Sequence, residues 1–330
     1  MTDAPTVPDA APPPLVEVVR DSAVESVHRG HVAVADANGA RLGWVGQVAV
    51  EIYPRSALKP FQAVVTRGWM QRGGVELDEA SIAIACASHE GSVDQQVEAA
   101  RLLALGGVDE AALRCPADRP FHPAALDDDP RPSRLAHNCS GKHAGFVAAQ
   151  ALSGGPIEAY LSPDAPLQVA VADELGRVCG AAPVGPGVDG CGAPAWRLPL
   201  DALARGFARL AGGQGRLGAI ADAMRARPEL VGGNAAVDTA LMRAVPGLVA
   251  KRGAEGILGC GVLTVDGPVG VAVKIADGAG RATGPAIAPV LAALGIEVPR
   301  VVARPLVLGG GEAHGELRPA GPVAELAQLR

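Results

Sequence analysis

Ser56 and Lys59 stand three positions apart in the stretch RSALKP. Residues at this spacing share one side of a helical turn, so both side chains can reach the same point. A buried lysine can accept the serine proton, and the hydroxyl can then attack an acyl carbon. A serine just before a helix is also a natural N-cap, beside free backbone N–H groups that would stabilise an oxyanion. Ser-x-x-Lys also arises by chance, so a capping serine with a solvated lysine stays an open alternative.

Lysine is scarce in this chain. Only four of the 29 basic residues are lysine, namely Lys59, Lys142, Lys251 and Lys274. Arginine stays protonated in proteins, whereas lysine can give up its proton or bind a metal. Lys274 lies in the apolar stretch AVKIA, where a charged ammonium is costly to bury. The scarcity therefore marks the lysines as candidate site residues, with edge exposure as the alternative for Lys274.

Two further stretches carry clustered ligating side chains. HNCSGKHAG places Cys139 three positions before Lys142, and DGCGAP supplies Cys191 from a glycine-rich turn. Two thiolates and a nitrogen donor suit zinc. The spacing is not a Cys-x-x-Cys pair and lysine is an unusual ligand, so two inert buried thiols are the simpler interpretation.

The composition limits the class of protein. A net charge of −6 provides no basic face for nucleic acid. No apolar run reaches the ~18 residues that a membrane helix needs. Residues 1–14 contain five prolines and no basic residue, which predicts a disordered tail rather than a secretory signal, followed by a single catalytic domain over 15–330. The six cysteines then lie in a reducing compartment, and a cytoplasmic location is expected.

The hydrophobic pattern predicts an α+β fold. Residues 15–46 alternate apolar and polar side chains around Asn38-Gly39, which predicts two or three antiparallel strands. Strands are also expected at 256–265 and 268–276, joined at Asp266-Gly267, so terminal strands form one antiparallel sheet covered by helices. Helical periodicity occurs in seven intervening segments, at 57–71, 93–105, 142–152, 166–178, 199–211, 216–226 and 234–244.

Six motifs in register resemble one family. RSALKPFQ, CASHEG, HNCSGKHAGF, DGCGAPAW, KRGAEG and AVKIADG are similar, in this order, to the asparaginase II family of thermolabile, Rhizobium etli-type L-asparaginases. The resemblance covers roughly residues 15 to 320. It implies a fold similar to serine β-lactamases and glutaminases, and a homodimer. The family usually has a Gly-Thr-Gly-Arg-like stretch where this chain has Gly232-Gly233-Asn234-Ala235-Ala236, which predicts a different loop near the site.

The resemblance also implies roles for individual residues. Two catalytic serine–lysine pairs would be Ser56 with Lys59 and Ser88 with Lys274. The remaining implied roles are zinc binding by Cys139, Lys142 and Cys191, with Cys260 near the metal, and substrate binding by Arg55, His143 and Asp189.

Together these features predict hydrolysis of L-asparagine to aspartate and ammonia. Ser56 would attack the side-chain amide carbon, Lys59 would accept its proton, and Ser88 and Lys274 would relay protons. Arg55 would bind the substrate carboxylate and Asp189 its ammonium. Zinc would fix the cysteine loops rather than polarise the amide. A glutaminase or another acyl-serine hydrolase stays an alternative, as does a non-catalytic zinc or thiol sensor.

Overall fold

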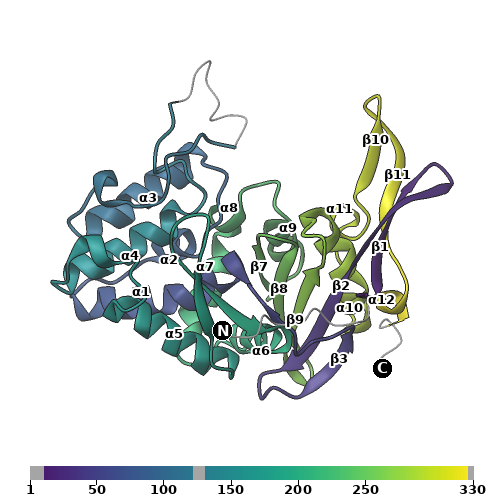
Figure 1. Ribbon diagram of the computed structural model, residues 1–330, viewed down its shortest axis with the longest axis horizontal. Coiled ribbons are helices and arrows are strands. Elements are labelled where there is room, and N and C mark those ends of the chain that lie inside the picture. Colours follow the sequence, from purple (N-terminus) through teal and green to yellow (C-terminus); the bar gives the residue numbers. More distant parts are fainter. Residues whose placement is uncertain (1–10, 122–130, 326–330) are drawn as a thin grey trace, which may run out of the picture.

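The fold is organised around an antiparallel sheet built from both ends of the chain (Figure 1). The computed structural model describes residues 11–121 and 131–325. The strands follow the order β10-β11-β1-β2-β9-β8-β7, and β3 pairs with β2. Their bounds are β1 Pro14–Arg20, β2 Ala23–Asp36, β3 Arg41–Val45, β7 Val249–Gly253, β8 Ile257–Thr264, β9 Gly267–Ile275, β10 Leu306–Gly309 and β11 Glu312–Pro319.

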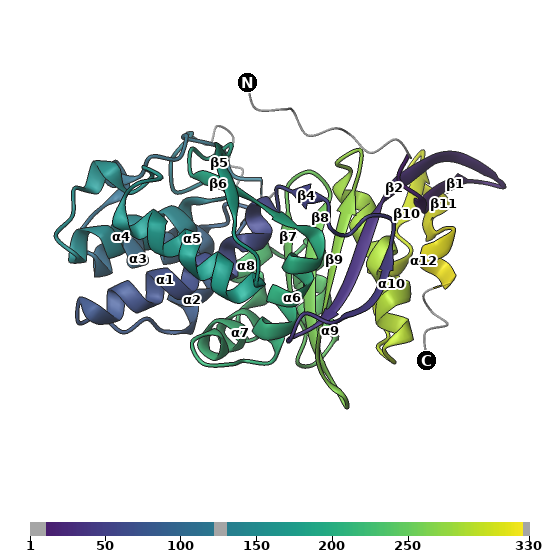
Figure 2. The same cartoon turned by 60° about the horizontal axis from the view of Figure 1, so that its bottom comes forward.

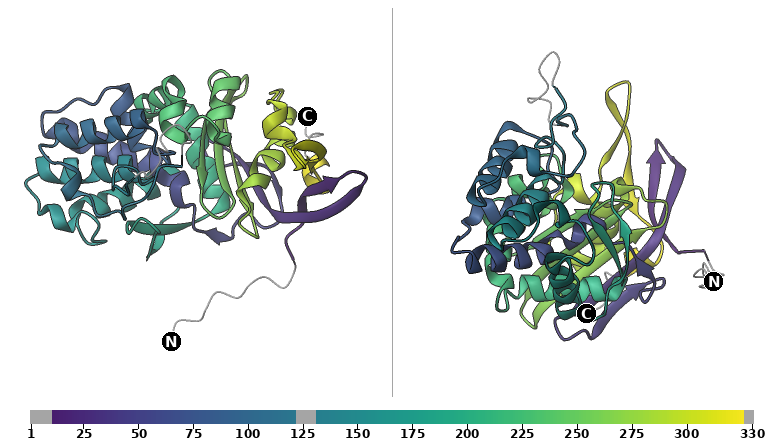
Figure 3. Two further views of the ribbon diagram at one scale, coloured as in Figure 1. Left: turned by 90° about the horizontal axis from the view of Figure 1, so that it is seen from above. Right: turned by 60° about the vertical axis from the view of Figure 1, so that its left-hand side comes forward.

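The sheet confirms the predicted α+β architecture. β2 pairs with β9 from Gly30 opposite Ile275 to Asp36 opposite Val269. The predicted hairpin at Asp266-Gly267 joins β8 to β9, with Gly267 in a left-handed conformation that favours glycine. Figure 3 shows the β1–β2 and β10–β11 hairpins projecting from the body of the molecule. The sheet therefore combines strands from opposite ends of the sequence.

Helix α6 (Leu200–Ala211) packs across β2, β8 and β9 (Figure 2). Glycines on the strands make this close approach possible. A Cβ at Gly259 would collide with the Phe207 ring, and one at Gly270 would collide with the Ala204 carbonyl. The predicted helix over 199–211 is thus confirmed and anchored to the sheet.

Some of the remaining helices pack against one another beside the sheet, and others pack against its strands. α1 contacts α4 and α5, whereas α10 contacts β9, β11 and β1. β4 (Glu51–Ile52), β6 (Pro194–Pro199) and β5 (Val184–Val188) form a second, small sheet. The helices and their bounds are α1 Lys59–Arg72, α2 Glu79–Ala85, α3 Val93–Leu105, α4 Ser140–Leu152, α5 Pro166–Cys179, α7 Leu217–Ala226, α8 Pro228–Gly232, α9 Val237–Ala244, α10 Thr283–Ala293, α11 Arg300–Ala303 and α12 Pro322–Glu325.

Two local predictions need correction. Ser56 is not an N-cap: it is the second residue of the short 3-10 helix η1 (Arg55–Leu58), which continues into α1, and Leu58 precedes α1 without a side-chain cap. The predicted tail over 1–14 lies largely outside the described residues, but Pro14 already belongs to β1 because it pairs with Arg29. None of the described helices combines the length and apolar character required to span a bilayer.

Candidate active site

Lys59 is the buried centre of the site. Its Nζ lies 3.0 Å from Ser88 Oγ and 3.2 Å from Cys139 Sγ, and it also hydrogen-bonds the Ala87 carbonyl. Lys59 begins α1, whose first turn lies against the segment that follows α2. The side chain therefore connects a serine hydroxyl with a thiol in a water-poor environment.

Ser56 lies at a cavity next to this centre. The cavity has a free volume of about 10 Å³, roughly the space of one water molecule. Ser56 has no side-chain hydrogen bond among the residues that the structure describes, and its carbonyl accepts the backbone N–H of Lys59. A free hydroxyl beside a lysine is suited to nucleophilic attack. The cavity is lined by Arg55, Ser56, Leu58, Lys59, Gln62, Lys142, Asp189, Pro194, Ala195 and Trp196.

The cavity also carries two opposite charges side by side. Arg55 Nη2 donates to Asp189 Oδ1 at 2.7 Å. This hydrogen bond raises the pKa of Arg55. Burial alone would raise the pKa of Asp189, but the hydrogen bond from Arg55 and the charge of Lys142 hold it below its ordinary value. Both groups are therefore charged, as recognition of a zwitterion requires.

Arg55 adopts an uncommon backbone conformation. Its φ of 52° lies in the left-handed region, which side chains other than glycine rarely occupy. Glu255, whose charge acts on Arg55, also has a positive φ, of 61°. Such conformations are retained where the surroundings determine them, and they are concentrated at functional sites.

The predicted pairing of serines with lysines is not what the structure contains. Lys59 bonds Ser88 rather than Ser56, and no hydrogen bond joins Ser88 to Lys274 among the described residues. Lys274 lies on β9 between His31 of β2 and Ile257 of β8, and its amine reaches the Glu255 carbonyl. In the described residues, Lys274 thus hydrogen-bonds Glu255 and not Ser88.

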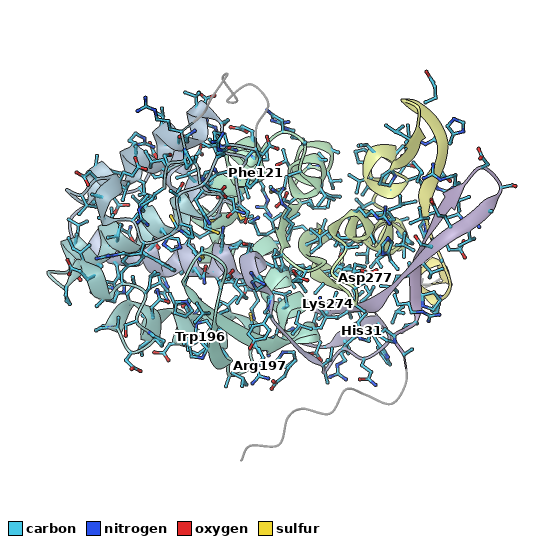
Figure 4. All side chains as sticks on the ribbon, turned by 45° about the horizontal axis from the view of Figure 1, so that its top comes forward. His31, Phe121, Trp196, Arg197, Lys274 and Asp277 are labelled. Carbon is cyan, nitrogen blue, oxygen red and sulfur yellow. The ribbon has the colours of Figure 1, made fainter. Side chains whose placement is uncertain are left out.

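Lys274 lies near the C-terminal end of the interior strand β9, beside other polar side chains. Figure 4 shows it near His31 and Asp277, with Trp196 over the helical side of the molecule. Burial lowers the pKa of Lys274, although Glu255 and Asp277 act in the opposite direction. Glu255 acts electrostatically on Arg55 as well, so this carboxylate links Lys274 to the cavity through charge.

The predicted zinc ligands are gathered in one cluster. Lys142 Nζ lies 3.1 Å from Cys191 Sγ, and Cys139 lies within hydrogen-bond reach of Cys191. That hydrogen bond, together with Lys59 and Lys142, lowers the pKa of Cys139 well below its ordinary value despite burial. Burial disfavours a charged Lys142, but interactions with Cys191, Cys139 and Asp189 outweigh it and raise its pKa. The Cys139 thiolate and the Lys142 ammonium therefore stabilise each other.

Two further predicted site residues, His143 and Cys260, do not line the cavity. His143 is fully buried: its Nδ1 is 2.7 Å from the Tyr160 hydroxyl, and its Nε2 faces Cys191 rather than the cavity. Burial lowers the pKa of His143 to about 4, so the ring is neutral. Cys260 lies in β8 opposite Val271, and burial alone raises its pKa. No hydrogen bond or charge connects Cys260 to the Cys139 cluster within the described segments.

A buried ion-pair network behind Ser88 was missed from the sequence. Lys251 Nζ lies 3.1 Å from Asp238 Oδ2, and both side chains are 0% exposed. Arg252 Nη1 donates to Asp238 Oδ1 at 2.9 Å, while its Nη2 donates to the Ser88 carbonyl at 2.9 Å. The network therefore fixes the backbone of Ser88. Lysine scarcity had marked Lys251, but no motif marked Asp238.

The atypical loop at 232–236 lies against the same network. The Gly232 carbonyl accepts from Arg252 at 3.1 Å, and the Ala235 N–H donates to Glu90 at 3.2 Å. Gly233 has a φ of 86°, and a Cβ there would collide with the Glu90 side chain. This loop shape thus depends on glycine and supports Ser88 from behind.

Several solved structures share features with the chain. Mglu in its native form has 15% identity and a TM-score of 0.43, covering 77% of this chain and 61% of that chain. Mglu in 4.3 M NaCl has 17% identity and a TM-score of 0.41, covering 76% and 56%. A beta-lactamase from Mycobacterium bovis has 17% identity and a TM-score of 0.34, covering 77% and 89%. The chain thus spans less than two thirds of Mglu, and similarities this weak carry no argument about activity.

The match to a protein family is much more extensive. No curated protein matches the chain. The model of L-asparaginase II matches residues 16–319, from β1 to the end of β11, and this range includes all the residues of the cavity and of the thiol cluster. The chain therefore belongs to the L-asparaginase II family.

Proposed function

We propose that this chain hydrolyses the side-chain amide of L-asparagine to L-aspartate and ammonia. The observation that carries the proposal is the Arg55–Asp189 ion pair, which lines the same cavity as Ser56 and Lys59. The α-carboxylate and α-ammonium of an amino acid are bonded to the same carbon. An adjacent arginine and aspartate therefore match the two groups in charge and spacing. The cavity is narrow, with about 10 Å³ of free volume, so its lining side chains must move apart when an amino acid binds.

Formation of the acyl-enzyme begins with attack of Ser56 Oγ on the amide carbon. Lys59 accepts the proton, with Ser88 as a relay 3.0 Å from its Nζ. The C–N bond then breaks, and the departing nitrogen takes a proton from Lys59 to leave as ammonia. The product of this half-reaction is an ester of Ser56 with the aspartyl side chain.

In the second half-reaction, which releases aspartate, water is the attacking group and Ser56 is the leaving group. A water molecule gives its proton to Lys59 and attacks the ester carbon. The bond to Ser56 Oγ breaks, and Lys59 returns a proton to this oxygen. No step requires Lys274, which has no hydrogen bond to either serine among the described residues.

Ammonia release from asparagine and glutamine, measured side by side, tests the substrate. We expect kcat/KM to favour asparagine by about tenfold or more, because glutamine adds one methylene to a small cavity. Equal rates would identify a general amidase. Metal binding without ammonia release from either amide would instead favour the zinc or thiol sensor.

The thiol cluster fits a zinc ion. Its donor set of two thiolates and one amine is chemically suited to zinc. No group of three or more His, Cys, Asp or Glu side chains that could hold a metal occurs in the described parts of the chain, so Lys142 would be needed beside Cys139 and Cys191. The buried His143 Nε2 has no hydrogen-bond partner and faces the cluster. Bound zinc would neutralise the thiolates and hold the two loops together.

Removal of zinc is expected to lower stability more than activity. Chelation should reduce the melting temperature of the metal-loaded protein, because metal binding to a folded site adds to folding stability. At a temperature where the protein stays folded, kcat/KM should remain within about twofold, since acid–base chemistry is assigned to Lys59. Cys191→Ser, treated in the same way, should show no further shift in melting temperature. Turnover that depends strictly on added metal would contradict this assignment.

Other assignments belong to the same proposal. We infer a cytoplasmic homodimer, with residues 15–330 as one catalytic domain. All six cysteines are free and buried, which supports a reducing compartment. The dimer rests on the resemblance of the sequence motifs.

A further inference from the structure

Three polar atoms without partners are concentrated at one cavity. Nine buried side-chain polar atoms have no hydrogen bond among the described residues, and three of them belong to Arg55, Gln62 and Trp196, which all line the Ser56 cavity. Leaving such an atom unpaired costs about 1–3 kcal/mol. Native proteins satisfy these groups through water or a ligand. Three such atoms on the lining of one narrow cavity mark it as a place where water or a ligand completes the hydrogen bonding.

Gln62 continues the polar face of the Ser-x-x-Lys pair. Ser56, Lys59 and Gln62 follow one another at intervals of three through η1 and the first turn of α1, and all three line the cavity. Gln62 is only 5% exposed, and its Oε1 has no partner. A buried amide oxygen is costly unless it accepts a hydrogen bond.

Trp196 offers a hydrogen-bond donor, whereas Gln62 Oε1 is an acceptor. It lies on β6, is 8% exposed, and its Nε1–H has no acceptor. Indole nitrogen only donates, whereas Gln62 Oε1 accepts. A primary carboxamide carries an N–H donor and a carbonyl acceptor on one carbon, so it complements the two groups together. A methyl group complements neither.

We propose that Gln62 and Trp196 form the subsite that binds the substrate's carboxamide. Gln62 accepts from the amide nitrogen, and Trp196 donates to the amide oxygen. Arg55 and Asp189 hold the amino-acid end, and the unpaired Arg55 Nε adds a donor for the carboxylate. This assignment rests on the proposed asparaginase function and extends it by separating recognition of the amide from recognition of the zwitterion.

Gln62→Met and Trp196→Phe test the subsite, because each removes hydrogen bonding while keeping an apolar body. We expect each to raise KM for L-asparagine by about tenfold, as loss of a hydrogen bond to a buried polar group predicts. L-2-aminobutyrate has the zwitterionic end without the amide. Its inhibition constant should stay within about twofold of wild type, since Arg55 and Asp189 are unchanged.

Matched controls separate the subsite from general packing. Gln150 is 2% exposed and also has an unpaired Oε1, but it lies on α4 outside the cavity lining. Gln150→Met, and Trp69→Phe on α1, should leave both constants unchanged. An unchanged KM in both test variants would overturn the proposal, with water alone satisfying these atoms. Equal weakening of asparagine and 2-aminobutyrate would also overturn it.

Failure of the proposed function has a different signature. In that case the wild-type protein releases no ammonia from asparagine, and calorimetric titration replaces KM. Preferential binding of asparagine over 2-aminobutyrate, lost in Gln62→Met, would then still support the subsite. Equal wild-type binding of both amino acids would overturn it.

Discussion

Replacement of Lys59 by methionine is expected to lower kcat for asparagine hydrolysis by about 10²- to 10⁴-fold, the usual contribution of general acid–base catalysis. Methionine fills most of the space of this buried side chain but cannot take a proton. Lys59 Nζ also donates hydrogen bonds to both Ser88 Oγ and Cys139 Sγ. Steady-state ammonia release, with circular dichroism to verify folding, measures the effect.

Lys59→Arg sharpens this test. Arginine keeps the positive charge but is not deprotonated in proteins. If Lys59 acts as a base, this variant is as inactive as Lys59→Met. If the lysine acts only as a cation, Lys59→Arg retains a large part of the wild-type rate, and the mechanism is wrong.

The two serines can be separated in the same assay. Ser56 lines the cavity, whereas Ser88 bonds Lys59 directly. With Ser56 as the nucleophile, Ser56→Ala loses turnover and the acyl-enzyme, and Ser88→Ala loses rate but still accumulates the ester. Mass spectrometry of rapidly quenched enzyme detects this ester. An acyl group on Ser88 would reverse the assignment.

Replacement of Asp238 by asparagine is expected to reduce the free energy of unfolding by about 3–5 kcal/mol, because it leaves a buried ammonium without its counter-ion. Burial alone would raise the pKa of Asp238, but Lys251 and Arg252 hold it well below its ordinary value. The carboxylate is therefore charged in the folded protein. Denaturant unfolding at neutral pH measures the loss of stability.

Asp222→Asn is the control for this change. Its side chain is 72% exposed and pairs with Arg225 at 3.5 Å, so the loss should stay below about 1 kcal/mol. A double variant, Asp238→Leu with Lys251→Met, removes both buried charges and should recover part of the stability. A loss from Asp238→Asn no larger than the control's would show that the buried pair contributes little.

Activity should respond to Asp238 as well. Asp238 holds Arg252, and Arg252 binds the carbonyls of Ser88 and Gly232. In Asp238→Asn, kcat should therefore fall more than KM rises, because the Ser88–Lys59 geometry is disturbed while the Arg55–Asp189 pair is intact.

The sequence pattern predicted helices and strands better than it predicted the contacts between them. The period-two alternation before Asn38 and the Asp266-Gly267 turn located β1–β3 and the β8–β9 hairpin, because hairpins are local. Elements that were not predicted are the helices α2, α8, α10, α11 and α12 and the strands β4, β5, β6, β7, β10 and β11. β10 and β11 expose many side chains, and β11 also pairs with the distant β1, so their local pattern is weak.

For the candidate site, too, the sequence predicted residues better than their contacts. Ser56 and Lys59 were found because they share a turn, and Cys139, Lys142 and Cys191 because clustered ligands are conspicuous in a sequence. Which hydroxyl meets Lys59 is decided by how α1 packs against the segment after α2, which no local spacing contains. For Lys274, the resemblance implied a partner, but the register of β9 with β2 and β8 sets its actual neighbours.

Gln62 could have been identified in advance. The spacing Ser56-x-x-Lys59-x-x-Gln62 extends the polar face by one turn, and a glutamine among apolar neighbours is a detectable anomaly. Trp196 gives no comparable signal, because an isolated tryptophan in a strand is an ordinary core residue.

The order of strands in the sheet affects how the protein is made. Glu17 and Arg318 form an ion pair between β1 and β11, although 301 positions separate them in the sequence. During synthesis, β1, β2 and β3 emerge early but lack β9 and β11 until almost the whole polypeptide has left the ribosome. Non-local pairing of this kind slows folding and leaves strand edges exposed to aggregation. Yield in a heterologous host should therefore depend on chaperones and on the rate of translation.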